Sequence, residues 1–299
     1  MLSIKKLLLV ATLCACFYGC ATRKVYREEL LGWKLGAQTY TFNRFTFLEA
    51  LKKVDSCGLR FVEAYPNQKL GGNMEGTMDY HMSIAKQQQV KDTLLKAGIK
   101  LVAYGVVSPK TPEDWKTLFV FSKQMGIETI VSEPAKADIP LISALCDEYK
   151  INVAIHNHPK PSIYWHPDTV LRVISGKSAR LGACADVGHW VRSGLDPVAS
   201  LRKLSGRVLH AHMKDLNEAG VRTAHDVPWG TGVTGIDRIV NELKAQRFKG
   251  MLSVEYEYHL LNSVPEIKES VQYFIGLFEL PSSSKTIPSS QTTPSSRTQ

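Results

Sequence analysis

Residues 181–190 have the sequence LGACADVGHW, in which a short run of small and apolar residues ends in an aspartate and a histidine follows three positions later. The pattern predicts a buried strand that ends at Asp186, followed by a loop that positions His189. Side chains alternate between the two faces of a strand, so Gly182 and Cys184 share the face of Asp186. A carboxylate in such an apolar strand is costly to bury unless it is paired or bound to a metal.

The rest of the chain alternates between predicted strands and predicted helices. Apolar runs bounded by Gly or Pro predict strands at residues 32–40, 59–65, 99–107, 127–133, 151–156, 207–214 and 251–258. Together with the strand that ends at Asp186, the sixth in chain order, they make eight. Helical spacing of apolar residues predicts helices at residues 45–57, 112–126, 139–149 and 264–278. Three further helices are predicted by one boundary each: one ends at Gly98, one begins at Pro197 and one begins at Ile236. Residues 67–81 contain Gly and Met, and their length predicts an active-site loop. Eight strand–helix units with short connections predict an α/β fold, a single-domain (β/α)8 TIM barrel over residues 31–280.

An open, doubly wound sheet is the alternative fold. Such a sheet normally carries a glycine-rich phosphate turn after an early strand. Residues 230–235, GTGVTG, have the glycine spacing of that turn, but they follow Pro228 and Trp229 late in the chain. We therefore interpret them as a loop, and the barrel remains the leading prediction.

Both ends of the chain differ in composition from the barrel region. After a basic start, residues 7–17 form an apolar run that is too short to span a membrane. With the small residues that follow, this start predicts a lipoprotein-type signal peptide over residues 1–20, lipidation at Cys20, and export to the periplasm or outer membrane as a lipid-anchored protein. Cys16 is the competing lipidation site, and a plain cleaved signal is the alternative. Residues 281–299 are rich in Ser, Thr and Pro, which predicts a disordered tail.

The overall composition is that of a globular protein, with 44% apolar and 22% charged residues among 299. The net charge is +9, but the lysines and arginines form no basic run, so nucleic-acid binding is not indicated. Cys57, Cys146 and Cys184 form an odd and sparse set that does not indicate a disulfide scaffold. The sequence leaves the oligomeric state open.

Acids and histidines lie at the end of most of the predicted strands. They are Glu63, Glu133, His156 with His158, Asp186 with His189, His212 with Lys214 and Asp215, and Glu255 with Glu257. The carboxyl ends of barrel strands meet at one mouth, so these side chains should converge there. A mixture of carboxylates and imidazoles suits a divalent ion such as Mn²⁺, Zn²⁺, Fe²⁺, Co²⁺ or Mg²⁺. The sequence therefore predicts a metal site at the mouth.

Several of these residues have a purely structural alternative. Glu133 precedes a proline and could stabilise a helix N-terminus. One of His156 and His158 could be a core histidine, and His210 lies deeper in its strand, where it could only pack. Trp229 is predicted near the mouth, where it could stack on a sugar, but packing is an equal alternative.

Four motifs give the chain a specific resemblance. They are DVGH at 186–189, AHMKD at 211–215, VPWGTG at 227–232 and GMLSVE at 250–255. In this order and spacing they resemble the sugar phosphate isomerase/epimerase superfamily, the xylose isomerase-like barrels. The resemblance implies that Asp186, His212 and Glu255 are metal ligands and that His189 contacts the substrate or a second metal.

The fifth strand departs from the pattern of this superfamily. In the ketose epimerases that the chain resembles, the fifth strand supplies a glutamate ligand. The corresponding residues here are His156, Asn157 and His158. The missing ligand is therefore sought in His156, His158 or Glu133. The departure weakens a mechanism with one acid on each face of the sugar and favours a one-base isomerase, a lyase or a dehydratase.

The resemblance implies a metal-dependent sugar isomerase or epimerase that removes a proton next to a carbonyl. Predicted export and the missing phosphate loop favour an unphosphorylated sugar or keto-sugar. Predicted catalytic residues are Glu133, Glu255, His189 and Lys214, and predicted substrate contacts are His158, His189, Lys214 and Trp229. A keto-glycoside lyase or dehydratase is one alternative, and a non-catalytic carbohydrate-binding barrel is another.

Overall fold

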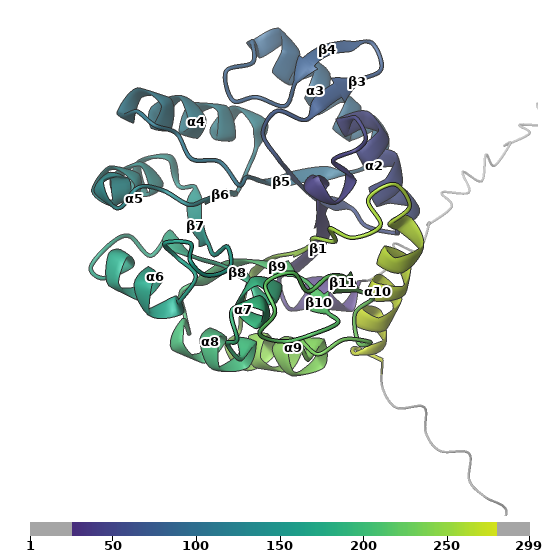
Figure 1. Ribbon diagram of the computed structural model, residues 1–299. Coiled ribbons are helices and arrows are strands. Elements are labelled where there is room, and N and C mark those ends of the chain that lie inside the picture. Colours follow the sequence, from purple (N-terminus) through teal and green to yellow (C-terminus); the bar gives the residue numbers. More distant parts are fainter. Residues whose placement is uncertain (1–25, 280–299) are drawn as a thin grey trace, which may run out of the picture.

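The computed structural model describes residues 26–279, and eight parallel strands in it form a closed barrel (Figure 1). In barrel order the strands are β1 Trp33–Gln38, β2 Phe61–Ala64, β5 Lys100–Tyr104, β6 Thr129–Ser132, β7 Asn152–His156, β8 Leu181–Asp186, β9 Val208–Met213 and β12 Gly250–Val254. Strand β12 pairs with β1 and closes the ring. The predicted TIM barrel is confirmed.

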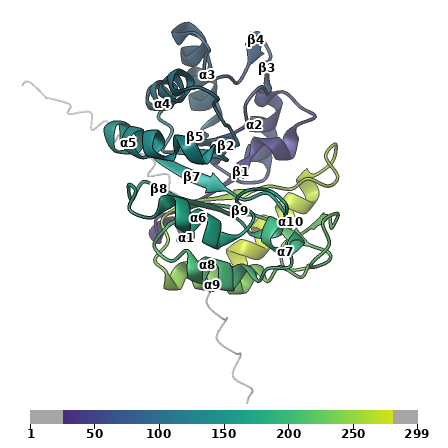
Figure 2. The ribbon, with the colours of Figure 1, turned by 60° about the vertical axis from the view of Figure 1, so that its left-hand side comes forward.

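The helices lie around the outside of the strands (Figure 1). They are α1 Arg27–Leu30, α2 Phe47–Ser56, α3 Ile84–Ala97, α4 Pro112–Met125, α5 Ile139–Tyr149, α6 Pro167–Ile174, α7 Val187–Arg192, α8 Pro197–Lys203, α9 Ile236–Ala245 and α10 Val264–Gly276. In Figure 2, helix α6 covers the outer face of β8. The helix ends follow local chemistry: Thr46 and Glu49 form a capping box at the start of α2, and Gly98 ends α3 with a φ of 65°.

Two predictions of loops need correction. Residues 67–81 contain a hairpin of strands β3 Lys69–Gly71 and β4 Met74–Thr77, which the sequence does not reveal because most of its side chains are exposed or half-buried. The segment after Asp186 is the short helix α7 rather than a loop. Its first turn is capped by Asp186, whose Oδ1 accepts a hydrogen bond from the backbone N–H of His189 at 2.7 Å.

The predictions for the chain ends, a signal peptide over residues 1–20 with lipidation at Cys20 and a disordered tail over residues 281–299, lie outside the described residues. Within residues 26–279, no helix has the length and apolar character needed to cross a membrane. The described cysteines Cys57, Cys146 and Cys184 are all buried and free.

Gly182 in β8 shows how tightly the barrel wall is packed. A Cβ at this position would lie 2.2 Å from the carbonyl oxygen of Arg207 on the neighbouring segment, so alanine would force the backbones apart. We expect Gly182→Ala to lower the free energy of unfolding by about 1–3 kcal/mol in urea titrations. Gly276→Ala is the control, because nothing lies within 4 Å of its added Cβ and α10 gains helix propensity. Equal urea midpoints for the two variants would show that the barrel wall can accommodate a methyl group at residue 182.

Candidate functional site

Four side chains from neighbouring strands meet at the mouth of the barrel. His156 ends β7, Asp186 ends β8, His212 lies near the end of β9, and Glu255 directly follows β12. One ligand atom from each lies within 4.8 Å of the others, and all four side chains are buried. The structure thus brings together the three ligands that the resemblance implies, with His156 as a fourth.

The distances within this set suit a bound cation. His212 Nδ1 lies 2.9 Å from Glu255 Oε2 and 3.8 Å from Asp186 Oδ2, and His156 Nε2 lies 3.5 Å from Asp186 Oδ2. An ion with metal–ligand bonds of about 2.0–2.2 Å separates tetrahedral ligands by roughly 3.4 Å. All four of these atoms are buried, and three of them, His156 Nε2, Asp186 Oδ2 and His212 Nδ1, have no hydrogen-bond partner. Because unpaired buried polar atoms are costly, the residues fit a divalent ion at the point where they converge.

The two histidines of this set are held by carboxylates on their other nitrogens. His212 Nε2 lies 2.8 Å from Glu63 Oε2, and His156 Nδ1 lies 3.2 Å from Glu133 Oε1. Each contact places a ring proton on the nitrogen that faces the carboxylate and leaves the other nitrogen free to bind a metal. This carboxylate–histidine arrangement is the usual support of a metal-binding histidine.

Glu63 is one of the acids that the sequence places at the end of a predicted strand. Its side chain is fully buried in the barrel, and its Oε2 also lies 2.8 Å from His210 Nε2. Burial alone would raise the pKa of Glu63, but the His212 and His210 imidazoles outweigh it and lower the pKa to about 2. Glu63 is 149 residues from His212, so only the closed barrel reveals the pair.

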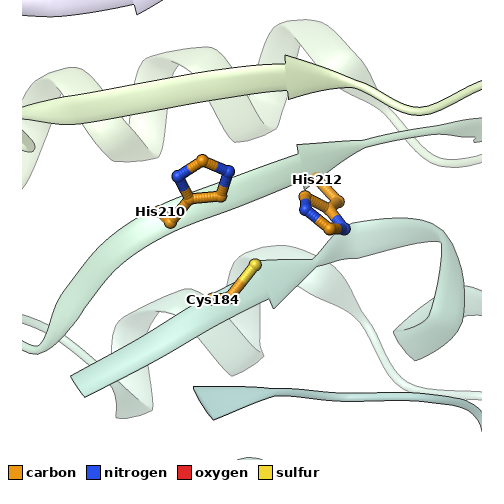
Figure 3. A group of neighbouring side chains, drawn as sticks. All are labelled: Cys184, His210 and His212. Carbon is orange, nitrogen blue, oxygen red and sulfur yellow. The ribbon is translucent and has the colours of Figure 1, made fainter. Parts of the chain in front are cut away.

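A second histidine and a cysteine lie beneath His212. Figure 3 shows His210 and His212 on one strand and Cys184 on the neighbouring strand. These three form another group whose ligand atoms lie within 4.8 Å of one another. Burial raises the pKa of Cys184 to about 12, so its sulfur remains a thiol. His210 is fully buried and lies deep in the barrel, as its position in the strand predicts.

Glu133 and His158 lie beside the four-residue set rather than in it. Glu133 Oε1 contacts the Nδ1 atoms of both His156 and His158 and accepts a hydrogen bond from the backbone N–H of His158 at 2.9 Å. Its Oε2 accepts a hydrogen bond from Ser162 Oγ at 3.2 Å. Both oxygens of Glu133 are thus engaged by the protein. Of the three candidates for the missing ligand, the structure places His156 among the other ligands.

Lys214 is a buried cation behind the ligands. Its Nζ lies 2.9 Å from Glu255 Oε2 and 3.8 Å from Asp186 Oδ2, and it forms an ion pair with Glu257. Burial would lower the pKa of Lys214, but Glu255, Glu257 and Asp186 raise it well above its ordinary value. A charged lysine cannot accept a proton, so Lys214 neutralises and orients the carboxylates.

A cavity of about 510 Å³ opens above this cluster. It is lined by Gln38, Tyr40, Tyr65, Pro66, Asn67, Gly105, Val106, His156, His158, His189, Glu255 and Glu257. Trp229 is not among the lining residues, and its predicted contact with substrate is not supported. Its side chain is 3% exposed, and its ring packs against Phe274 with centroids 6.0 Å apart.

His189 lies at the edge of the cavity. Its Nε2 lies 3.6 Å from Asp186 Oδ2, and its Nδ1 lies 3.1 Å from Arg192 Nη1. Burial lowers the pKa of His189 well below its ordinary value. The charges of Lys214 and Arg192 lower this pKa further, and together these effects outweigh Asp186, which raises it. The imidazole is therefore neutral.

Glu63→Gln tests the support of His212 while keeping the shape of the side chain. The variant loses the charge that holds the ring, so we expect the affinity for a divalent ion to fall by about 10- to 100-fold in calorimetric titrations. Glu128→Gln is the matched control, because Glu128 is exposed and pairs with Lys34 far from the mouth. An unchanged affinity in Glu63→Gln would show that His212 needs no such support.

Comparisons with known proteins agree with this architecture. Residues 51–277 match the family described as xylose isomerase-like TIM barrel. An uncharacterised protein of Parabacteroides distasonis is 35% identical, with a TM-score of 0.68 over 81% of this chain and 98% of that chain.

Two further comparisons are more distant. A zinc-bound structure of the IolI protein is 15% identical, with a TM-score of 0.64 over 82% of this chain and 97% of that chain, and this likeness shows the fold alone. Inosose dehydratase 1 of Bacillus cereus is 26% identical over 131 residues, or 39% of this chain. The match covers 44% of that relative, and the chain spans less than half the length of the curated relatives reported for it. By its family match and its barrel, the chain belongs to the xylose isomerase-like TIM barrel family.

Proposed function

We propose that the protein is a metal-dependent enzyme that removes a proton next to the carbonyl of an unphosphorylated sugar or keto-sugar. The observation that carries this proposal is the convergence of four buried ligand atoms at the floor of a cavity. The ion would be Zn²⁺, Mn²⁺, Fe²⁺, Co²⁺ or Mg²⁺, held by His156, Asp186, His212 and Glu255. Such an ion supplies a Lewis acid that polarises a carbonyl oxygen.

The chain's own residues would bind the sugar and transfer the proton. His158 lines the cavity, and its Nδ1 contacts Glu133, which leaves Nε2 as the ring nitrogen open to a substrate. A histidine held in this way by a carboxylate is suited to proton transfer, so His158 is our candidate for the group that takes up the proton. Glu133 then acts through His158 and His156, in place of the direct catalytic role that the sequence predicts.

The distribution of acids around the cavity favours chemistry with one base. The lining carboxylates, Glu255 and Glu257, both follow β12, and no other aspartate or glutamate is among the residues that line the cavity. This arrangement supports an isomerase, lyase or dehydratase over an epimerase with one acid on each face. The likeness to inosose dehydratase 1 supports the elimination reaction as the second candidate. No lysine or arginine is among the residues that line the cavity, which supports a substrate without phosphate.

The test combines metal loading with product analysis. Metal-loaded protein would be incubated in D₂O with an inosose, a 3-keto-glucoside and a free keto-hexose, and the products followed by NMR. Incorporation of deuterium next to the carbonyl, with or without loss of a leaving group, supports the proposal and separates isomerisation from elimination. Tight binding of a sugar without exchange or turnover would favour a non-catalytic carbohydrate-binding barrel.

We also propose that the protein is exported and anchored to a membrane by lipid at Cys20. The basic start and the apolar run before Cys20 support this proposal. Labelling of cells with a radioactive fatty acid tests it, with Cys20→Ser expected to lose the label and Cys16→Ser expected to keep it. The opposite pattern would assign the anchor to Cys16, and no label in the unaltered protein would favour a plain cleaved signal.

A further inference from the structure

Arg192, the last residue of α7, forms a hydrogen bond whose direction is fixed by chemistry. Its Nη1 lies 3.1 Å from Nδ1 of His189, three residues earlier in the same helix. A guanidinium group has five N–H donors and no acceptor. Nδ1 of His189 must therefore be the acceptor, so the imidazole is neutral and carries its proton on Nε2.

The guanidinium is held in place from several sides. Its Nε donates to the carbonyl oxygen of Ala224 at 3.0 Å, its Nη2 donates to Asp226 Oδ2 at 3.4 Å, and its Nη1 lies 4.0 Å from Glu257 Oε2. The side chain is only 9% exposed. Arg192 therefore cannot turn away from His189 without losing its own bonds to the carbonyl of Ala224 and to the buried Asp226.

The opposite nitrogen of His189 faces the functional site. Nε2 lies 3.6 Å from Asp186 Oδ2, one of the four converging ligand atoms, and His189 lines the cavity. An N–H donor is thus presented beside the place where a substrate oxygen would bind. Preorganised donors of this kind stabilise the negative charge that develops on an oxygen in the transition state.

We propose that Arg192 is a positioning residue that holds His189 as a neutral hydrogen-bond donor to a substrate oxygen. The identity of that oxygen rests on the proposed function. With Nδ1 bonded to Arg192 and Nε2 protonated, His189 neither takes up the substrate proton nor binds a second metal ion. Of the two alternatives that the resemblance leaves open for His189, this role keeps the contact with the substrate and replaces the contact with a second metal.

The tautomer can be measured on the metal-free, full-length protein without any substrate. Two-bond ¹⁵N–¹H spectra of histidine-labelled protein report which ring nitrogen carries the proton, and His189→Gln assigns the signals of His189. We expect the proton on Nε2 in the unaltered protein, and part of the population with the proton on Nδ1 in Arg192→Met. Arg202→Met is the control, because Arg202 is exposed and pairs with Glu242. A proton on Nδ1 in the unaltered protein would overturn the proposal, whether or not Arg192→Met folds.

Kinetics then test the donor role. On whichever of the three keto-sugars the protein converts, Arg192→Met should lower kcat about 10- to 100-fold with little change in KM, because the donor acts in the transition state. An unchanged kcat with an altered tautomer would refute the donor role. If none of the sugars is converted, the proposed function and the donor role both fail, while the spectrum still decides whether Arg192 fixes the tautomer.

Discussion

Replacement of His212 with alanine should abolish binding of the metal and lower kcat/KM by roughly 10³-fold. The Lewis acidity of a bound ion contributes several kcal/mol, and each 1.4 kcal/mol corresponds to a factor of ten in rate. His212 is central to the site because Nδ1 lies within 4 Å of both Glu255 Oε2 and Asp186 Oδ2. Asp186→Ala should give the same loss, since Asp186 supplies the oxygen that faces both histidines of the set.

Elemental analysis of the purified proteins checks this expectation. The unaltered protein should retain nearly one equivalent of a divalent ion, and both variants should retain none. His259→Ala is the matched control for a lost imidazole, because His259 lies on an exposed loop and pairs with Glu266. If His212→Ala retained metal at the level of the control, the four-residue set would not be the metal site.

Asp215→Ala should lower the free energy of unfolding by about 3 kcal/mol, because it leaves several backbone donors without a partner. The Oδ2 of this buried aspartate accepts hydrogen bonds from the N–H groups of Gly230 at 2.8 Å and Gly232 at 3.0 Å. Its Oδ1 accepts from Thr234 at 2.9 Å and Leu216 at 3.0 Å. The glycine-rich segment is thus wrapped around a carboxylate of the protein itself and is a loop, as the sequence predicts.

Chemical denaturation with urea measures the loss. Asp55→Ala serves as the control, because Asp55 is an exposed aspartate of α2 and its removal should change the free energy of unfolding by less than about 0.5 kcal/mol. Equal stabilities of the two variants would mean that water satisfies the loop amides. Gly232 could not carry a side chain in this arrangement, since a Cβ would lie 2.4 Å from Asp215 Oδ1.

The barrel could be predicted from the sequence because its strands and helices are each marked locally. Strand β8 ends at Asp186 and helix α5 spans Ile139–Tyr149, both as predicted. Apolar runs that end in acids or histidines mark the mouth, and the converging His212 and Glu255 follow from that pattern.

The remaining features depend on contacts between distant parts of the chain. The contact of Glu63 with His212 exists only once the barrel closes, and the choice of His156 over His158 and Glu133 depends on ring orientation. The buried indole of Trp229 could not be distinguished by spacing from one at the mouth. Helix α7 had a local signal, since aspartate is a favoured N-cap, but its six residues are too short to show helical periodicity.

The uneven origin of the cavity lining has a consequence for engineering the proposed activity. The converging ligands come from the second half of the chain, on β7, β8, β9 and after β12, whereas Gln38, Tyr40, Tyr65 and Asn67 come from the first. The two groups occupy separate segments of the gene. Libraries restricted to codons 38, 40, 65 and 67 should therefore alter which sugar is accepted while leaving the four ligands and their support at Glu63 intact.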